Sequence, residues 1–331
     1  MNRRGHIIGP GAYAQFGEAR FVVAVIDLDA DEPQPQLIDI GFLGHGVSID
    51  PSRPHEAAVF EKKGPGGCRI DLREGKMIEP ITTAPNHHFY GHGAYSVDGS
   101  LLYATEAVLD DDFRGALVVR DAKTLAVLGE LPTYGTSPHD CMLLEDGKTM
   151  MVANGGGFIH AGAMPNVSYV DVASETLIER VDLTDPRFNA GHLARTEKGD
   201  LAVVSAPRDG LPNPHKQLGA ITLVPKGKPP TTMKKPELVT GNMFGETLSV
   251  AIHDGLVIAT QPDANMLTMW RMEDCTYAGR LELTEPRGIT LTLDRRHFVV
   301  SHKIGQSVAL SLLATETQRF EQQRIDPSFT S

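Results

Sequence analysis

The chain has 331 residues, 41% of them hydrophobic and 22% charged, which is enough to bury one large core or two ordinary ones. A formal net charge of −11 argues against binding to nucleic acid or to an anionic membrane surface, since both need clustered positive charge. Three widely spaced cysteines without a CxxC pair argue against a disulfide framework and a structural zinc site. No apolar run approaches the roughly 18 residues of a membrane helix, so no membrane insertion is expected.

The first sixteen residues, MNRRGHIIGPGAYAQF, have a charged start but lack the apolar region of a signal peptide. By its own sequence, therefore, this chain is not expected to be exported, and residues 1–16 are interpreted as a flexible or leader-derived N-terminus. Alternating apolar residues between positions 6 and 41 also predict three strands, with no inner strand before them.

A repeat dominates the rest of the chain. Each unit has a polar first residue, a strand, an Asp-Gly-type hairpin turn and a second apolar strand, as in GHGAYSVDGSLLYATE and GHLARTEKGDLAVVSAP. A third strand that often ends in Asp follows, as in ALVVRDAKTL, and then a fourth, as in AVLGELP. Four strands per unit are typical of a propeller blade.

The units start at positions 45, 92, 139, 192, 246 and 287, at intervals of 41 to 54 residues, which suits blades with variable loops. We therefore predict an all-β protein, a seven-bladed β-propeller that forms a single domain over residues 1–331, with six blades as the alternative. The C-terminal segment RFEQQRIDPSFTS is expected to complete the N-terminal blade and close the ring. A β-sandwich of duplicated hairpins would not explain a repeat of this length.

Three phrases also resemble a known family: FYGHGAYSVDGSLLYATE, GTSPHDCMLLEDGKTMMVANGG and AGHLARTEKGDLAV. They look like the bacterial propellers grouped as domain of unknown function 1513 (DUF1513), and the resemblance runs from about residue 20 to the C-terminus. It implies a seven-bladed propeller of the quinoprotein amine dehydrogenase β-chain type. The family is usually exported by the twin-arginine route and often encoded near iron-uptake proteins, so the resemblance implies a periplasmic location; it implies no established activity.

Four of the six start positions are histidines, and the inner strand of a propeller blade lines the central channel. His45, His92, His139 and His192 are therefore expected to form an arc around one axis. Because neutral imidazole is a common ligand of transition metals, these four residues are the candidate metal ligands, for Fe, Cu or Zn. The alternative interpretation is architectural, with each ring bonded to backbone or to a neighbouring strand.

The other two start positions are charged, and a further histidine precedes the second unit. Glu246 is expected to add a carboxylate, and Arg287 to suit an anion at the channel mouth. His88, expected on a loop before the strand, is the third candidate for cofactor or ligand binding, with a surface role as the alternative.

Three classes of function remain open at this point. The first is a propeller that binds a small-molecule or metal ligand in its channel, in periplasmic iron or other metal handling. The second is an enzyme, either a metal-dependent lactonase or a redox protein; histidines at the axis favour a transition metal over calcium. The third is a non-catalytic scaffold for a protein partner. Fold class alone does not decide among them.

Overall fold

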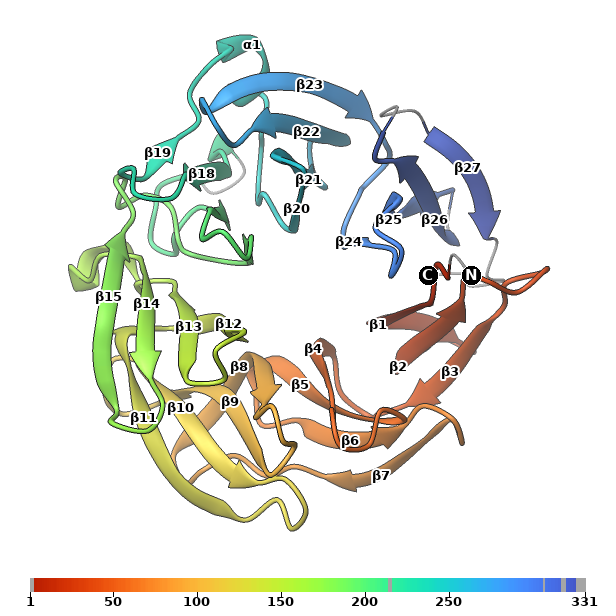
Figure 1. Ribbon diagram of the computed structural model, residues 1–331, viewed down its shortest axis with the longest axis vertical. Helices are drawn as coiled ribbons and strands as arrows, with labels where there is room; N and C mark the ends of the chain where they lie inside the picture. The colour runs from red at the N-terminus through yellow and green to blue at the C-terminus, as the bar shows by residue number, and fades with distance from the viewer. Residues whose placement is uncertain (1–2, 214–215, 306, 317–319, 326–331) are drawn as a thin grey trace.

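A computed structural model describes residues 3–213, 216–305, 307–316 and 320–325, and its strands surround a central axis (Figure 1). One short helix, α1 (Glu237–Thr240), and one 3-10 turn (Ile159–Ala161) are present among these residues. The first strands are β1 (His6–Gln15), β2 (Glu18–Asp27), β3 (Pro35–Asp39), β4 (Gly44–Ile49), β5 (Glu56–Gly64), β6 (Gly67–Asp71), β7 (Lys76–Pro80), β8 (His87–Tyr95), β9 (Leu101–Val108), β10 (Arg114–Asp121) and β11 (Val127–Thr136).

The remaining strands follow in chain order around the axis (Figure 1). They are β12 (Pro138–Leu143), β13 (Thr149–Asn154), β14 (Asn166–Asp171), β15 (Thr176–Asp182), β16 (Leu193–Arg195), β17 (Leu201–Ser205), β18 (Ala220–Val224), β19 (Thr231–Thr232), β20 (Val250–His253), β21 (Leu256–Gln261), β22 (Met266–Arg271), β23 (Thr276–Glu282), β24 (Ile289–Leu291), β25 (His297–Ile304), β26 (Ser307–Ala314) and β27 (Phe320–Ile325).

The all-β propeller is confirmed, but the predicted number of separate blades is not. Counted by hydrogen bonding, the described strands form one three-stranded sheet, one eight-stranded sheet and four four-stranded sheets, so five sheets have four strands or more. The eight-stranded sheet contains two units, β4–β7 and β8–β11, because β5 runs on into the next unit and pairs with β8. Its register there joins Lys62 to Tyr90 and Gly64 to Phe89. Neither seven nor six separate blades result.

Among the described residues, the ring closes by side-chain packing between the first and last sheets, which share no strand. The predicted closing segment forms β27, which pairs with β26 of its own unit, while residues 326–331 lie outside the described part. Across the junction, Ile26 and Leu28 of the N-terminal sheet pack against Val299, Leu310 and Leu312 of the C-terminal sheet. The expectation that strands from both ends share one sheet is therefore wrong, since β26 already supplies an edge with which the C-terminal strand pairs.

The N-terminal segment forms three strands, as predicted, but the inner strand is present. β1 lies nearest the axis beside β4, and β3 lies outermost (Figure 1). The two inner strands pack closely: a Cβ added to Gly44 in β4 would lie only 2.9 Å from Cβ of Pro10 in β1. Residues 6–15, expected to be flexible or leader-derived, are therefore part of the propeller. Among the described residues, the N-terminal sheet has no fourth, outer strand.

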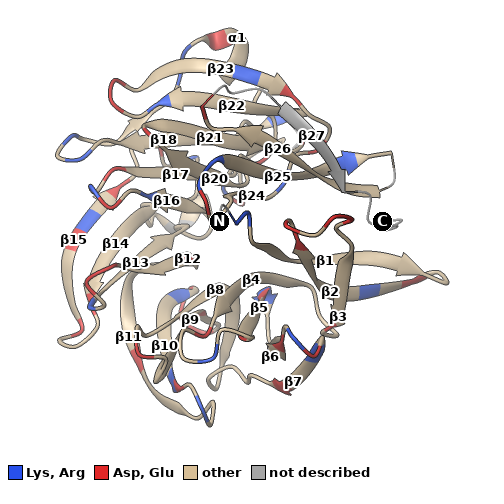
Figure 2. Ribbon diagram, turned by 45° about the vertical axis from the view of Figure 1, so that its right-hand side comes forward, with Lys and Arg blue, Asp and Glu red and all other residues tan. Residues whose placement is uncertain are grey.

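Burial follows the order of strands within each unit. The second strands β13, β17 and β21 are buried along their whole length, whereas the fourth strand β15 is largely exposed and β23 alternates between exposed and half-buried residues. Figure 2 shows the same gradient in charge, with acidic and basic residues mostly in turns and on outer strands. This arrangement follows from stacked sheets, because only the inner three strands have a neighbouring sheet on each face.

Two kinds of turn explain the sequence repeat. The predicted Asp-Gly hairpins carry left-handed glycines, with φ of 69° at Gly99 and 65° at Gly147. The Asp at the end of the third strand caps the next turn: Asp121 accepts hydrogen bonds from the backbone N–H groups two and three residues later. Asp71 and Asp171 do the same in their units, so the recurrent Asp is a turn residue.

No helix in the described part of the chain is long and apolar enough to cross a membrane. The three cysteines are unpaired, and burial raises the pKa of Cys68 to about 12. That thiol is therefore an apolar packing group at neutral pH.

Candidate metal centre

The six start positions of the repeat all lie at the inner end of a unit, as predicted. His45, His92 and His139 are in the inner strands β4, β8 and β12. His192 immediately precedes the inner strand β16, and Glu246 and Arg287 precede β20 and β24 by a few residues.

Irregular backbone presents three of the histidines to the axis. The strand pairing shifts register between Gly44 and Gly46, between Phe89 and Gly93, and between Pro138 and Cys141. Each interval contains one of the histidines. A β-bulge changes the direction of a side chain relative to the regular alternation, and here it turns the rings out of the sheets toward one another.

The structure brings the four predicted histidines together, and they are called the histidine cluster below: His45, His92, His139 and His192. Their Nε2 atoms meet at 3.1 Å (His45–His139), 3.0 Å (His45–His192), 3.2 Å (His92–His192) and 3.1 Å (His139–His192). The candidate ligand atoms all lie within 4.8 Å of one another. One ring from each of four successive units thus approaches a common centre; that these residues bind a metal stays a prediction.

Hydrogen bonds at the opposite ring nitrogens determine the tautomer of two members. His139 Nδ1 lies 2.9 Å from the carbonyl oxygen of Tyr90, and His192 Nδ1 lies 2.6 Å from that of Leu248. A carbonyl only accepts, so each Nδ1 carries the hydrogen and donates it. In the neutral rings both Nε2 atoms therefore present lone pairs to the centre of the cluster.

Asp140 was not among the predicted site residues, and it supports a third ring. Its Oδ1 lies 3.3 Å from Nδ1 of His92, while its Oδ2 accepts a hydrogen bond from the backbone N–H of Leu193. A carboxylate behind a histidine is a common arrangement at metal sites, because it orients the ring and raises its basicity. The adjacency His139–Asp140 was visible in the sequence, but that Asp140 faces the ring of another unit was not.

Burial keeps the cluster neutral. Loss of hydration lowers the pKa of His92 and His192 to about 4, in His192 with a further lowering by His92. The pKa values of His45 and His139 are also lowered, first by burial and then by neighbouring histidines. Neutral imidazole is the form that binds metals, so the rings are in that form at neutral pH.

Two glycines beside the histidines make room for the cluster. A Cβ on Gly91, which has φ of 124°, would lie 2.7 Å from Cδ2 of His45. A Cβ on Gly46 would lie 2.3 Å from the carbonyl oxygen of Gly91 and 2.9 Å from Nδ1 of His92. The repeated Gly-His-Gly at 44–46 and 91–93 was the sequence signal for this close approach.

A pocket of about 340 Å³ ends against two rings of the cluster, His139 and His192. Its walls include apolar and aromatic side chains and several charged ones. Two predicted ligand-binding residues line it: Glu246 and His88, although His88 lies within β8 and not on a loop as expected.

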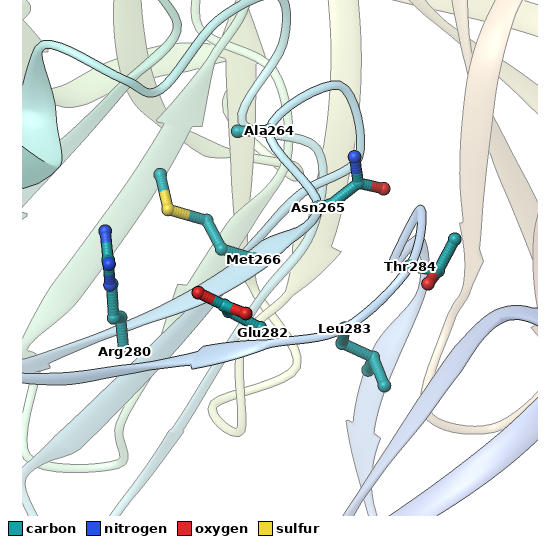
Figure 3. Close-up of a pocket in the computed structure, with 7 residues that line it drawn as sticks. All are labelled: Ala264, Asn265, Met266, Arg280, Glu282, Leu283 and Thr284. Carbon is teal, nitrogen blue, oxygen red and sulfur yellow. The ribbon is translucent and has the colours of Figure 1, made fainter.

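The predicted carboxylate ligand, Glu246, lies outside the histidine cluster. Glu246 is not among the residues whose ligand atoms cluster, and its Oε1 lies 4.0 Å from Nη2 of Arg287. Arg287, expected at the channel mouth, is a partly exposed ion-pair partner of Glu246. A second pocket, of about 300 Å³, lies on β22 and β23 and contains Met266, Arg280 and Glu282 but no cluster histidine (Figure 3).

Comparison with known proteins gives a family and a fold. The family model described as "Protein of unknown function (DUF1513)" matches residues 38–329. No curated protein matches the sequence. Among solved structures, hydrazine synthase of Kuenenia stuttgartiensis has a TM-score of 0.69 at 13% identity, covering 88% of this chain and 91% of that chain. A hypothetical selenium-binding protein from Sulfolobus tokodaii has a TM-score of 0.68 at 10% identity, covering 98% and 91%. At these identities the likeness extends to the fold alone.

Proposed function

The chain belongs to the DUF1513 family, and from its site we propose that it binds one transition-metal ion in the histidine cluster. The observation that carries the proposal is the contact between His139 and His192. Their Nε2 atoms lie 3.1 Å apart, yet both Nδ1 hydrogens are donated to carbonyl groups. Two neutral rings in these tautomers face each other with lone pairs, which repel unless a cation lies between them.

A shared proton would also relieve the repulsion, but burial opposes it. Protonating one ring places a positive charge in a site that already lowers the pKa of every member. A metal ion is different, because four ring nitrogens compensate for the water that it loses.

The distances support the same conclusion. Nitrogens bound to one ion at about 2.0–2.1 Å lie about 2.9–3.4 Å apart when the angle between them is about 90–110°. Four of the six pairs of Nε2 atoms in the cluster have separations of 3.0–3.2 Å, within that interval. The carbonyls behind His139 and His192 and the carboxylate behind His92 are the supporting groups that metal-bound histidines normally have.

The donor set favours copper or zinc. Four imidazoles without a carboxylate suit Cu and Zn better than the mixed histidine and carboxylate centres of non-haem iron. A role in iron handling, and a periplasmic location, remain part of the proposal and are supported by the family resemblance alone.

A metal-dependent enzyme is the second candidate function. The pocket that ends against His139 and His192 gives a small molecule a route to the ion from one side, which a purely structural metal site does not need. Turnover of a lactone panel, or of a redox dye by the copper-loaded protein, separates an enzyme from a carrier.

Metal analysis of the untagged protein tests the proposal. The protein is stripped with chelator, incubated with Cu²⁺ or Zn²⁺, desalted and analysed by mass spectrometry for metal per chain. We expect one ion per chain in the wild type, and retention of less than a tenth of it in the His92→Ala/His139→Ala double variant.

The matched control is His55→Ala, since His55 is partly exposed and lies outside the cluster. It should retain the wild-type stoichiometry. Circular dichroism establishes that each variant is folded before its metal content is compared. A wild-type protein that retains neither metal contradicts the proposal.

A further inference from the structure

We propose that the pocket above the histidine cluster binds a small organic anion, a carboxylate with an apolar body, whose charged end becomes a further ligand of the metal ion and is held there by Lys62. The inference rests on the proposed function, because the ion is one of the two cationic groups that would bind the carboxylate.

The pocket reaches the histidine cluster from one side. It ends against His139 and His192, whereas His45 and His92 do not line it. A molecule in the pocket therefore approaches the centre of the cluster from one side, past two rings. Cu²⁺ and Zn²⁺ both accept a ligand beyond the protein's own donors when a side of the coordination sphere is accessible.

The charge of the site also favours an anionic ligand. Four neutral imidazoles carry no charge, so they leave the positive charge of a divalent ion uncompensated by any directly bound anion. Asp140, the carboxylate in contact with the cluster, faces Nδ1 of His92 and does not line the pocket. An anionic ligand on the pocket side supplies the missing negative charge in a site of low dielectric constant.

Among the described cations of the pocket wall, Lys62 is the one whose charged end has no hydrogen-bond or ion-pair partner. The neighbouring Lys63 forms an ion pair with Asp209, its Nζ 3.6 Å from Oδ2. Arg208 is buried, and its guanidinium uses four of its five N–H groups to bind the carbonyls of Gly156, Gly157, Phe158 and Pro186, so at most one remains for a ligand. Lys62, by contrast, has no ion-pair or side-chain hydrogen-bond partner among the described residues.

Lys62 is also close enough to act on the cluster, because its positive charge lowers the pKa of all four histidines. Glu246, which also lines the pocket, attracts Lys62, but Glu246 also pairs with Arg287. A carboxylate between Lys62 and the metal ion would contact two cations at once.

Aromatic side chains in the pocket suit an apolar body of the ligand. Tyr90, Phe113 and Phe158 line the pocket, and the rings of Tyr90 and Phe113 lie 6.5 Å apart. A volume of about 340 Å³ is at the low end for small-molecule sites. These features favour a compact, partly aromatic carboxylate over a polymer or a polyanion.

The test uses the full chain loaded with Co²⁺, whose visible bands change when a ligand of the ion changes. Azide probes access to the ion, and benzoate and benzamide probe the ligand class, since they differ in charge and hardly in shape. We expect saturable changes with azide and benzoate, competition between the two, and at least tenfold weaker binding of benzamide.

Lys62→Gln should weaken benzoate binding by about ten- to hundredfold without changing the cobalt content. Lys63→Gln is the matched control, because its charge is already paired with Asp209, and should change the affinity by less than about threefold.

The outcomes separate the two proposals. A wild-type protein that takes up no Co²⁺, Cu²⁺ or Zn²⁺ overturns the metal site and this inference together. Cobalt uptake with bands that neither azide nor benzoate alters overturns the anion site and leaves the metal site standing. Equal affinity for benzoate and benzamide, or an unchanged affinity in Lys62→Gln, overturns the role of charge.

Discussion

Asp140 in β12 and His92 in β8 belong to neighbouring units of the propeller and face each other. Oδ1 of the carboxylate lies 3.3 Å from Nδ1 of the ring. That nitrogen is the opposite one from Nε2, which lies 3.2 Å from His192. A carboxyl group outside the histidine cluster therefore holds one of its rings in place, and the contact makes Asp140 a positioning residue.

Asp140→Asn should weaken metal binding by about 10- to 100-fold while leaving the protein folded, because the amide loses the negative charge that raises the basicity of His92. The amide oxygen can still accept the hydrogen bond from Leu193. Competition with a chromophoric chelator measures the affinity. Asp146→Asn, in an exposed turn, is the control; equal affinities in the two variants would remove Asp140 from the site.

The metal-free protein should lose stability as the pH falls from about 6.5 to about 4. Burial lowers the pKa of His92 and His192 to about 4 in the folded state, against about 6.5 in the unfolded chain. Between these values the unfolded chain binds more protons, so the free energy of unfolding falls as pH falls, by up to about 1.4 kcal/mol per pH unit for each ring.

Urea unfolding in the presence of chelator at pH 7, 6, 5 and 4.5 measures this slope. A His92→Gln/His192→Gln variant should have a flatter profile over the same interval, and its difference from the wild type isolates the two rings. Parallel profiles would mean that these histidines do not titrate differently in the folded and unfolded chains.

Gly91→Ala should impair both folding and metal binding. The residue has φ of 124°, which an L side chain rarely adopts, and its Cβ would lie 2.7 Å from the ring of His45. We expect a loss of about 2 kcal/mol or more in unfolding free energy and reduced metal retention in the folded fraction.

Gly129→Ala is the matched glycine control, since a Cβ at that position in β11 meets nothing within 4 Å. It should leave the metal content unchanged and the stability nearly so. If Gly91→Ala behaves like Gly129→Ala in both measurements, the close packing of the cluster against the backbone is not required.

A buried ion pair between Arg120 and Glu106 should dominate the stability of the β9–β10 region. Both side chains are inaccessible to solvent, and Arg120 also donates to the carbonyl of Thr82 at 2.7 Å. Arg120→Met leaves the Glu106 carboxylate buried without its partner, so we expect a loss of about 3–5 kcal/mol in chemical unfolding.

Two further variants test whether that loss of stability comes from the buried, unpaired charge. Arg120→Met/Glu106→Gln should recover part of the stability, because no unpaired charge remains. Arg114→Met breaks an exposed pair with Asp111 and should cost about 1 kcal/mol or less. A similar loss in Arg114→Met and Arg120→Met would contradict the importance of burial.

The repeat made the all-β propeller predictable, because turn chemistry and strand alternation are local. An Asp that caps its own turn and a glycine that takes positive φ act over a few residues, so the sequence repeats them wherever the turn recurs. The same regularity placed His45, His92, His139 and His192 at equivalent positions of successive units, and equivalent positions near one axis lie close in space.

Contacts between units were beyond that kind of inference. The pairing of Lys62 with Tyr90, which joins two units in one sheet, depends on how far β5 extends past its own unit. The pairing of β27 with β26 and the place of β1 at the axis depend on which free edge each terminal strand meets. None of these choices has a signal within a window of a few residues.

By itself, then, the sequence determined the type of strand and turn, the family, and the four histidines that share one position in the repeat. Only the tertiary structure decided which groups support those rings, namely Asp140 and the carbonyls of Tyr90 and Leu248, and that Glu246 pairs with Arg287 outside the cluster. The physical reason is that periodicity specifies the direction of a side chain relative to its own strand. The distance between atoms of different units depends instead on bulges, close glycine contacts and the packing of whole sheets.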